Sequence, residues 1–210
     1  MMAPGLLRLG GGVKFVGVGS IASNTGTGVN IQQGTDTKVG DLLVGIAASV
    51  GSNAAWTPVA GFTEIFDPAS GCDAEAVYAA ASQAGVYGYG QCTTSTSNNK
   101  SAITAAFRKA AYDAIGSNAT LSTTGSLVIP SVTLSKGGVV VALVASGGTS
   151  GTHSPPGSMQ TAYSGQPGGG YPTVSIFYEK IGAGASGTRT VTIGGTPGNS
   201  TGVLVALIKA

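Results

Sequence analysis

Two short stretches of this chain match the spelling of motifs that perform chemistry in other proteins. The run V13-K-F-V-G-V-G-S-I-A22 ends in a G-x-G-x-x-A pattern close to the phosphate loop of dinucleotide-binding enzymes. Such a loop binds pyrophosphate only where a strand leads into a helix whose N-terminal N–H groups face the ligand. The following run, S23-N-T-G-T-G-V-N-I-Q-Q-G34, consists of poor helix formers without an apolar stripe. We therefore predict no nucleotide site and interpret the glycines as a bend or bulge in a strand.

The second stretch, G198-N-S-T-G202, matches the G-x-S-x-G nucleophile elbow of hydrolases. An elbow requires a helix after the serine, with an acid and a histidine later in the chain. The chain ends eight residues after Gly202, its single histidine is His153, and Ser200 lies among Gly, Pro and Asn typical of a hairpin loop. We therefore predict that Ser200 is a turn residue and that the protein is not an enzyme.

Metal and thiol chemistry have little support in the sequence. One histidine and two cysteines give no closed ligand set at a recognised spacing, so we expect no metal and no other cofactor. Cys72 and Cys92 flank a predicted hairpin and could form a disulfide. Two free, buried thiols are the interpretation that we favour slightly, because unpaired cysteines behave as small apolar residues.

The composition favours assembly. Only 9% of the residues are charged, 36 of the 210 are glycine, and the formal net charge is +2. With so few charges, much of the surface is expected to be Ser, Thr, Asn and Gly or to be covered by other subunits. The basic residues are scattered singly in the sequence apart from Arg108-Lys109, so we predict no nucleic-acid partner and no membrane partner.

The sequence predicts neither a membrane-spanning helix nor a signal peptide. The longest apolar runs, such as V139-V-V-A-L-V-A145, are strand-sized and well below the roughly 20 residues of a membrane-spanning helix. The first residues, M1-M-A-P-G-L-L-R-L-G-G-G12, lack the basic region and the apolar core of a signal peptide. We expect synthesis in the cytoplasm and a flexible N-terminal arm over residues 1–12.

An internal repeat organises the rest of the chain, over residues 40–110 and 137–210 approximately. Each half contains a set of about four predicted strands, so the chain is expected to form one domain over residues 13–210. Three pairs of segments match: G40-D-L-L-V-G-I-A-A-S-V-G51 with G137-G-V-V-V-A-L-V-A-S-G-G148, Tyr78 with Tyr178, and A106-F-R-K-A110 with A206-L-I-K-A210.

The predicted elements are short strands bounded by Gly, Pro, Ser and Asn. The alanine-rich run A102-I-T-A-A-F-R-K-A-A111 would also pass as a helix, but its repeat partner V203-L-V-A-L-I-K209 is rich in β-branched residues, so we predict a strand there too. Turn signals at intervals of about 8 to 12 residues then predict an all-β, jelly-roll-like β-sandwich. We expect about eight antiparallel strands, built from two repeated four-strand halves.

Five segments follow one another along the chain: F15-V-G17, G40-D-L-L-V44, T57-P-V-A-G-F62, Y178-E-K-I-G-A-G184 and A206-L-I-K-A210. Their order resembles that in the virion structural proteins of tailed bacteriophages. The resemblance spans nearly the whole chain and rests on structural motifs without catalytic residues. It implies a non-enzymatic capsid decoration, fibre-base or tail subunit, made in the host cytoplasm and located in the virion, whose partners are other virion subunits.

Two further expectations follow. Jelly-roll virion subunits often pack around a three-fold axis, so the resemblance favours a homotrimer over a dimer. The alternative function is a carbohydrate-binding or adhesion module, because jelly rolls also host sugar sites. The candidate contacts for either an interface or a glycan are tyrosines in Gly-rich stretches: Tyr87, Tyr89, Tyr163 and Tyr171.

Overall fold

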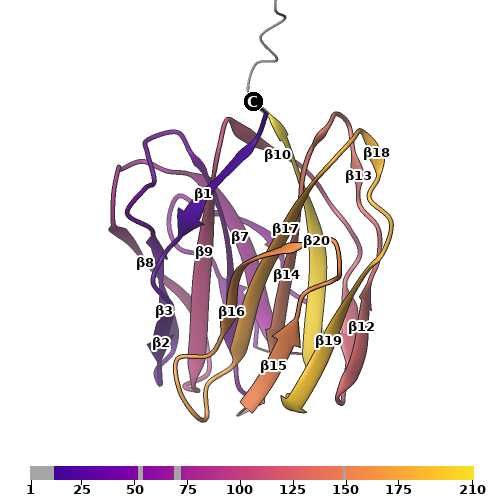
Figure 1. The fold of residues 1–210 in the computed structure, drawn as a ribbon. Coiled ribbons are helices and arrows are strands. Elements are labelled where there is room, and N and C mark those ends of the chain that lie inside the picture. Colours follow the sequence, from indigo (N-terminus) through magenta and orange to yellow (C-terminus); the bar gives the residue numbers. More distant parts are fainter. Residues whose placement is uncertain (1–11, 52–53, 69–71, 149) are drawn as a thin grey trace, which may run out of the picture.

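A computed structural model describes residues 12–51, 54–68, 72–148 and 150–210. Within these ranges the chain forms twenty β-strands and no helix, and every strand pair is antiparallel (Figure 1). The predicted all-β class is thereby confirmed. Nearly all of the arm predicted over residues 1–12 lies outside the described residues.

The first half of the chain forms one large and one small sheet. The large sheet has the order β1-β9-β4-β7-β6, with β2 also paired to β9, and the small sheet has the order β3-β8-β5. The strands are β1 (Lys14–Val18), β2 (Ala22–Asn24), β3 (Gly28–Gln33), β4 (Leu42–Ser49), β5 (Trp56–Thr57), β6 (Thr63–Phe66), β7 (Asp73–Ala80), β8 (Tyr87–Thr94) and β9 (Lys100–Arg108).

The second half repeats this arrangement. Its large sheet has the order β10-β20-β14-β17-β16, with β11 also paired to β20, its small sheet has the order β12-β19-β15, and β13 pairs with β18. The strands are β10 (Ala110–Ile115), β11 (Ala119–Leu121), β12 (Gly125–Ile129), β13 (Thr133–Leu134), β14 (Gly138–Ser146), β15 (Ser150–Ser154), β16 (Gln160–Gly165), β17 (Thr173–Ile181), β18 (Gly184–Ala185), β19 (Arg189–Thr196) and β20 (Ser200–Lys209).

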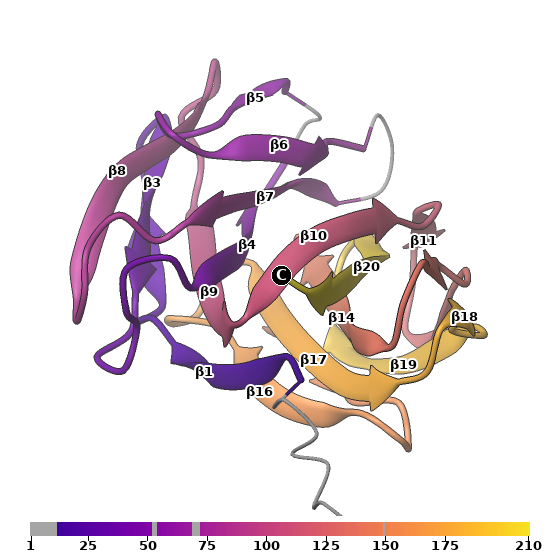
Figure 2. The same ribbon diagram turned by 90° about the horizontal axis from the view of Figure 1, so that it is seen from above.

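The two large sheets and the two three-stranded sheets stack as four layers, with the large sheets in the middle (Figure 2). One apolar cluster lies between the large sheets and includes Val44, Ile46, Val141 and Val205. Each half has one further apolar cluster, which lies between its large sheet and its small sheet. The large sheets are therefore covered on both faces, which explains why β4 and β20 are almost continuous runs of buried, mostly apolar residues.

The small sheets have one face toward solvent, and their strands alternate accordingly. In β12 and β19, buried Leu127 and Val191 are followed by exposed Val128 and Thr192. Each half is thus a small sandwich of its own, and the strands are more numerous than the predicted eight. The pairing does not confirm the jelly-roll connectivity, because every sheet contains strands from one half only.

The two halves share register as well as strand order. Phe15 of β1 faces Phe107 of β9, and the pairing shifts by one residue directly afterwards. At the corresponding place in the second half, Tyr112 of β10 faces Leu207 of β20, again with a shift directly afterwards. The shift in β1 confirms the prediction that this Gly-containing stretch forms a bulged strand.

The chain passes from the first half to the second through a single residue. Arg108 ends β9 in one large sheet, Ala110 begins β10 in the other, and Lys109 between them has a φ of 56°. The Lys109 carbonyl accepts a hydrogen bond from the Ala210 N–H at 3.1 Å, which ties this crossover to the end of β20. Residues 102–111, for which a helix was the alternative, therefore belong to two strands of different sheets.

Candidate binding site at the seam between the two halves

The edges of the two large sheets meet at two seams, and each seam is closed by a pair of aromatic rings. At the first seam, Phe15 of β1 stacks on Tyr178 of β17 with ring centroids 4.5 Å apart. At the second seam, Tyr112 of β10 stacks on Tyr78 of β7 with centroids 4.6 Å apart. The internal repeat of the sequence, including the match of Tyr78 with Tyr178, thus places equivalent aromatic residues at both seams.

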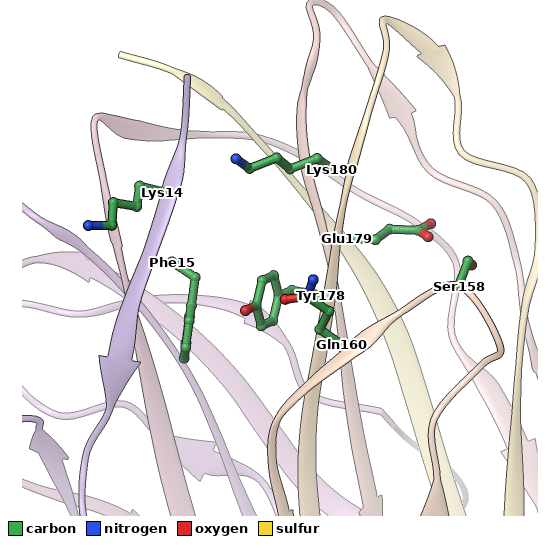
Figure 3. Close-up of a pocket in the computed structure, with 7 residues that line it drawn as sticks. All are labelled: Lys14, Phe15, Ser158, Gln160, Tyr178, Glu179 and Lys180. Atoms are coloured by element: carbon green, nitrogen blue, oxygen red, sulfur yellow. The ribbon is translucent and has the colours of Figure 1, made fainter. Parts of the chain in front are cut away.

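The first seam contains a cavity of about 390 Å³, which we call the seam pocket (Figure 3). Its position follows from the strand lengths. The edge strand β16 begins at Gln160, opposite Tyr178, whereas β17 continues to Ile181 alongside β14. The end of β17 therefore has no β16 neighbour, and a notch opens there. The residues that line it are Lys14, Phe15, Ser158, Gln160, Tyr178, Glu179 and Lys180.

The electrostatics of the seam pocket favour a negatively charged ligand. Lys14 and Lys180 are exposed, and among the described residues neither ammonium has an ion-pair partner. The carboxylate of Glu179 is already paired: it accepts hydrogen bonds from Nε of Arg189, at 2.6 Å, and from Nη2 of the same guanidinium. The lining is therefore left with two uncompensated positive charges.

The second seam keeps the aromatic pair but has none of this polar lining. The match in register shows which residues correspond, because Gln160 faces Tyr178 just as Thr63 faces Tyr78. Small or uncharged residues stand in the second seam at each polar position of the first: Ala111 for Lys14, Gly61 for Ser158, Thr63 for Gln160, Ala79 for Glu179 and Ala80 for Lys180.

The seam pocket lies at an end of the molecule where exposed lysines gather, which we call the basic end. It is the upper end in Figure 1, next to the marked C-terminus. Of the lysines that the structure describes, only Lys100 lies elsewhere, and it is buried. The other lysines, all exposed, are Lys14, Lys38, Lys109, Lys136, Lys180 and Lys209.

Sequence reasoning missed this gathering because the lysines are isolated along the chain. Each one lies at a strand end or in an adjacent turn, and antiparallel pairing brings those positions to one end: Lys14 faces Arg108, and Ala110 faces Lys209. The position of the lysines at the boundaries of the predicted strands could have indicated that they gather at one end. Arg108 is held by Asp41, with an Nη2 to Oδ2 distance of 2.7 Å, so the exposed lysines provide the free charge.

A second candidate for chemistry is a buried hydroxyl network around His153. Its Nε2 lies 2.7 Å from Oγ of Ser146, its Nδ1 lies 2.8 Å from Oγ of Ser175, and Ser146 is 2.7 Å from Ser200. Burial lowers the pKa of His153 to about 4. A cavity of about 360 Å³ borders this histidine. Ser200 begins strand β20 and is fully buried, so the prediction that it is a turn residue is wrong, and a strand instead of a helix follows it in the G198-N-S-T-G202 motif.

The equivalent region of the first half holds a buried acidic cluster. The Trp56 indole N–H donates to Asp73 at 2.7 Å, and the ammonium of Lys100 donates to the carbonyls of Gly26 and Thr96 at 2.9 and 2.8 Å. Burial raises the pKa of Asp73 to about 6 and that of Glu75 to about 7. Within the described ranges, His, Cys, Asp and Glu form no group of three or more arranged to hold a metal ion.

The disulfide weighed from the sequence is not formed. Both cysteines are free and buried, and Cys72 belongs to the cluster between the large sheets, whereas Cys92 belongs to the cluster under the first small sheet. Burial raises the pKa of each thiol well above its usual range. Inert, neutral thiols inside the core are the result.

The four candidate tyrosines are not brought together. Tyr87 and Tyr89 lie in strand β8 with ring centroids 4.9 Å apart, while Tyr163 lies in β16 and Tyr171 in the loop before β17. Tyr89 has a structural role, since its hydroxyl donates to Oε1 of Gln33 at 2.6 Å. The aromatic residues at the seam pocket, Phe15 and Tyr178, were not among the residues selected from the sequence.

The stretch after Gly19 forms a strand, as predicted from its poor helix formers. Gly19 is followed by strand β2, so no helix N-terminus faces this turn.

No family model, curated protein or solved structure matches this chain. Among the described residues, no helix is long and apolar enough to cross a membrane.

Proposed function

We propose that this protein is a non-enzymatic structural component of a tailed-bacteriophage virion, either a capsid decoration, a fibre-base or a tail subunit. It acts through contacts with other virion subunits after synthesis in the host cytoplasm. The basic end is the observation that carries the proposal: a chain with few charges gathers its exposed lysines on one end. Such an arrangement gives a directional face for a negatively charged neighbour.

Exposed apolar side chains at the same end favour a protein partner over nucleic acid. Val39 is 67% exposed, Val86 64% and Tyr87 41%. The two turns that carry them are joined, because the Gly85 N–H donates to the Thr37 carbonyl at 2.8 Å. Apolar and aromatic residues surrounded by charge are typical of protein interfaces, whereas phosphate contacts need mainly cations.

Electron microscopy and mass spectrometry of purified phage particles test this proposal. We expect the protein in the particle, with its basic end against an acidic surface of a neighbouring subunit. The triple variant Lys109→Glu, Lys136→Glu, Lys209→Glu should fold, because all three residues are exposed, and should be absent from particles. Particles that never contain the protein, or that incorporate the triple variant as well as the parent, would overturn the proposal.

A homotrimer is the favoured assembly within this proposal. Sedimentation at micromolar concentration should give a species near three times the 20.3 kDa mass of the monomer. A single species at the monomer mass, combined with no contact between copies in a particle map, would contradict it.

The second candidate function is a carbohydrate-binding module, and the seam pocket is the observation that favours it. An aromatic pair beside amide and hydroxyl side chains is an arrangement that suits a sugar. A glycan array probed with the labelled protein tests this function directly. Binding to no glycan on the array would remove it.

A further inference from the structure

We propose that the seam pocket binds a carboxylated sugar, that is, a pyranose ring carrying an acid group, such as a hexuronate. The proposal rests on the carbohydrate-binding function above and names its site and ligand class. Its basis is a juxtaposition: two exposed lysines, two stacked aromatic rings, an amide and a hydroxyl surround one cavity of about 390 Å³.

The lysines account for the acid group. Lys14 and Lys180 lie on the same side of the aromatic pair, toward the basic end (Figure 3). In Figure 3 the ammonium of Lys180 points toward β1, whereas the side chain of Lys14 extends away from the aromatic pair. A carboxylate in the pocket would therefore gain a charge-assisted hydrogen bond from Lys180 and a longer-range attraction from Lys14. Glu179 does not cancel this attraction, because Arg189 donates to its Oε1 and neutralises it. The pocket therefore selects for negative charge on its ligand.

The remaining side chains account for the ring. Phe15 and Tyr178 form an apolar wall, against which the C–H face of a pyranose can pack. Gln160 offers both donors and an acceptor, and Ser158 offers a hydroxyl, as sugar hydroxyl groups require. The cavity volume is near the lower limit of about 300 to 1,000 Å³ for small-molecule sites, which suits one or two rings.

The second seam shows that this lining is not required by the fold. It has the same strand order and the same aromatic stack, and it closes with alanine, glycine and threonine at the polar positions. Apart from Glu179, which pairs with Arg189, the polar lining of the first seam adds nothing that the seam needs for packing. A ligand gives the other polar residues a role that the fold does not.

The experiment is a titration of the isotope-labelled protein with D-glucuronate, followed by NMR, with D-glucose as the matched neutral sugar. The key variant combines Lys14→Ala, Ser158→Gly, Gln160→Thr and Lys180→Ala, which gives the first seam the residues of the second at every polar position except Glu179, whose carboxylate stays paired with Arg189. We expect this variant to fold, because the second seam tolerates those residues. Lys136→Ala, at the same end but outside the pocket, is the control for general electrostatic attraction.

We expect saturable shifts at the seam pocket with D-glucuronate and none with D-glucose. Lys180→Ala should weaken binding about tenfold, as expected for one hydrogen bond between charged groups. The combined variant should abolish binding, and Lys136→Ala should leave it unchanged. A second arm uses an acidic oligosaccharide: tighter binding than the monosaccharide identifies a polymeric glycan as the source of the ligand, and equal binding identifies the free sugar.

Three results would overturn the proposal. The first is binding of D-glucose with the affinity measured for D-glucuronate. The second is binding of inorganic phosphate with the affinity of D-glucuronate and with the same response to Lys136→Ala. The third is the absence of any shift at the pocket. Neutral glycans bound on the array would leave the carbohydrate-binding function standing while this proposal falls, whereas an empty array would remove both.

Discussion

Equivalent buried positions in the two halves hold different chemistry. In the first half, Ser49 of β4 faces Asp73 on one neighbouring strand and Lys100 on the other. In the second half, the equivalent Ser146 of β14 faces Thr173 and Ser200. Charged groups therefore correspond to hydroxyl groups.

The two clusters also differ in hydrogen bonding. In the second half, both ring nitrogens of His153 have hydroxyl partners, whereas in the first half Oδ2 of Asp73 and both carboxylate oxygens of Glu75 have none. The fold accommodates a buried polar cluster at this position and leaves its chemical identity free.

The two seams teach the same lesson at the surface. Both need an aromatic pair to close the contact between the large sheets, and both have one. At the first, lysine, glutamine and serine side chains line a cavity beside that pair, whereas the equivalent positions of the second are alanine, glycine and threonine. A difference between structurally equivalent positions separates residues needed for packing from residues available for binding.

Exchanging the charged residue of one cluster for its counterpart should have the largest effect. Ser200→Lys places an ammonium in the second half, where Thr173 replaces the Asp73 that faces Lys100. Because this charge would be buried without a counter-ion, we expect a loss of about 3–5 kcal/mol in the free energy of unfolding, measured with urea. The reciprocal Lys100→Ser should cost about 1–3 kcal/mol by removing the hydrogen bonds that the ammonium donates to the Gly26 and Thr96 carbonyls.

Ser126→Lys, at an exposed position of the same half, is the control for adding a lysine and should change stability by less than about 0.5 kcal/mol. If Ser200→Lys behaves like this control, the two clusters are interchangeable and the comparison fails.

The acidic cluster should destabilise the protein as the pH rises. The pKa of Glu75 is raised to about 7, so the folded state keeps a proton that the unfolded chain releases above its ordinary carboxyl pKa. Stability therefore falls between about pH 4.5 and pH 7. Glu75→Gln should remove the Glu75 part of this dependence, leaving the smaller part due to Asp73, and gain roughly 3 kcal/mol over the parent at pH 8, with little difference at pH 4. Urea unfolding at both values measures it, and an equal difference at both would contradict the assignment.

The histidine network should have the opposite dependence. Burial lowers the pKa of His153 to about 4, so below about pH 6.5 the unfolded chain takes up a proton that the folded state refuses. Stability then falls as the pH drops toward 4, by roughly 2–3 kcal/mol. His153→Gln should lower stability at pH 7 by removing hydrogen bonds, but its unfolding free energy should change less between pH 7 and 5. His153 is the single histidine, so an unaltered acid limb in this variant would exclude it as the cause.

The smallest effect concerns the two equivalent lysines Lys109 and Lys209. Lys109 has a φ of 56°, a left-handed conformation that costs a non-glycine residue on the order of 1 kcal/mol. Lys109→Gly should therefore stabilise the protein by about that amount. Lys209→Gly, in strand β20, should destabilise it by about 0.5–1 kcal/mol. Thermal unfolding of both variants checks the difference, and a change of the same sign in both would contradict it.

Much of the fold could be predicted because strand formation and repetition are local properties of the sequence. The β-branched run of residues 139–145 and the alternation in residues 189–193 indicate strands without reference to the rest of the chain. The match of Tyr78 with Tyr178 indicates equivalent positions in two halves, and the structure places both at seams. The absence of a helix after Gly19 follows from residue types alone.

The number of layers and the candidate site could not be predicted, because both depend on which strands pair at long range. A continuous apolar strand such as β14 is buried on both faces, but nothing local says which sheet covers each face. The lysines looked dispersed because their spacing in the chain is large. Antiparallel pairing brought strand ends to one end of each sheet, and the packing of the two large sheets placed Lys14 and Lys180 around one cavity. The residue sequence determined the strands, their repetition and the scarcity of charge; the tertiary structure decided where that charge gathers, since strand ends distant in sequence meet only when the sheets form.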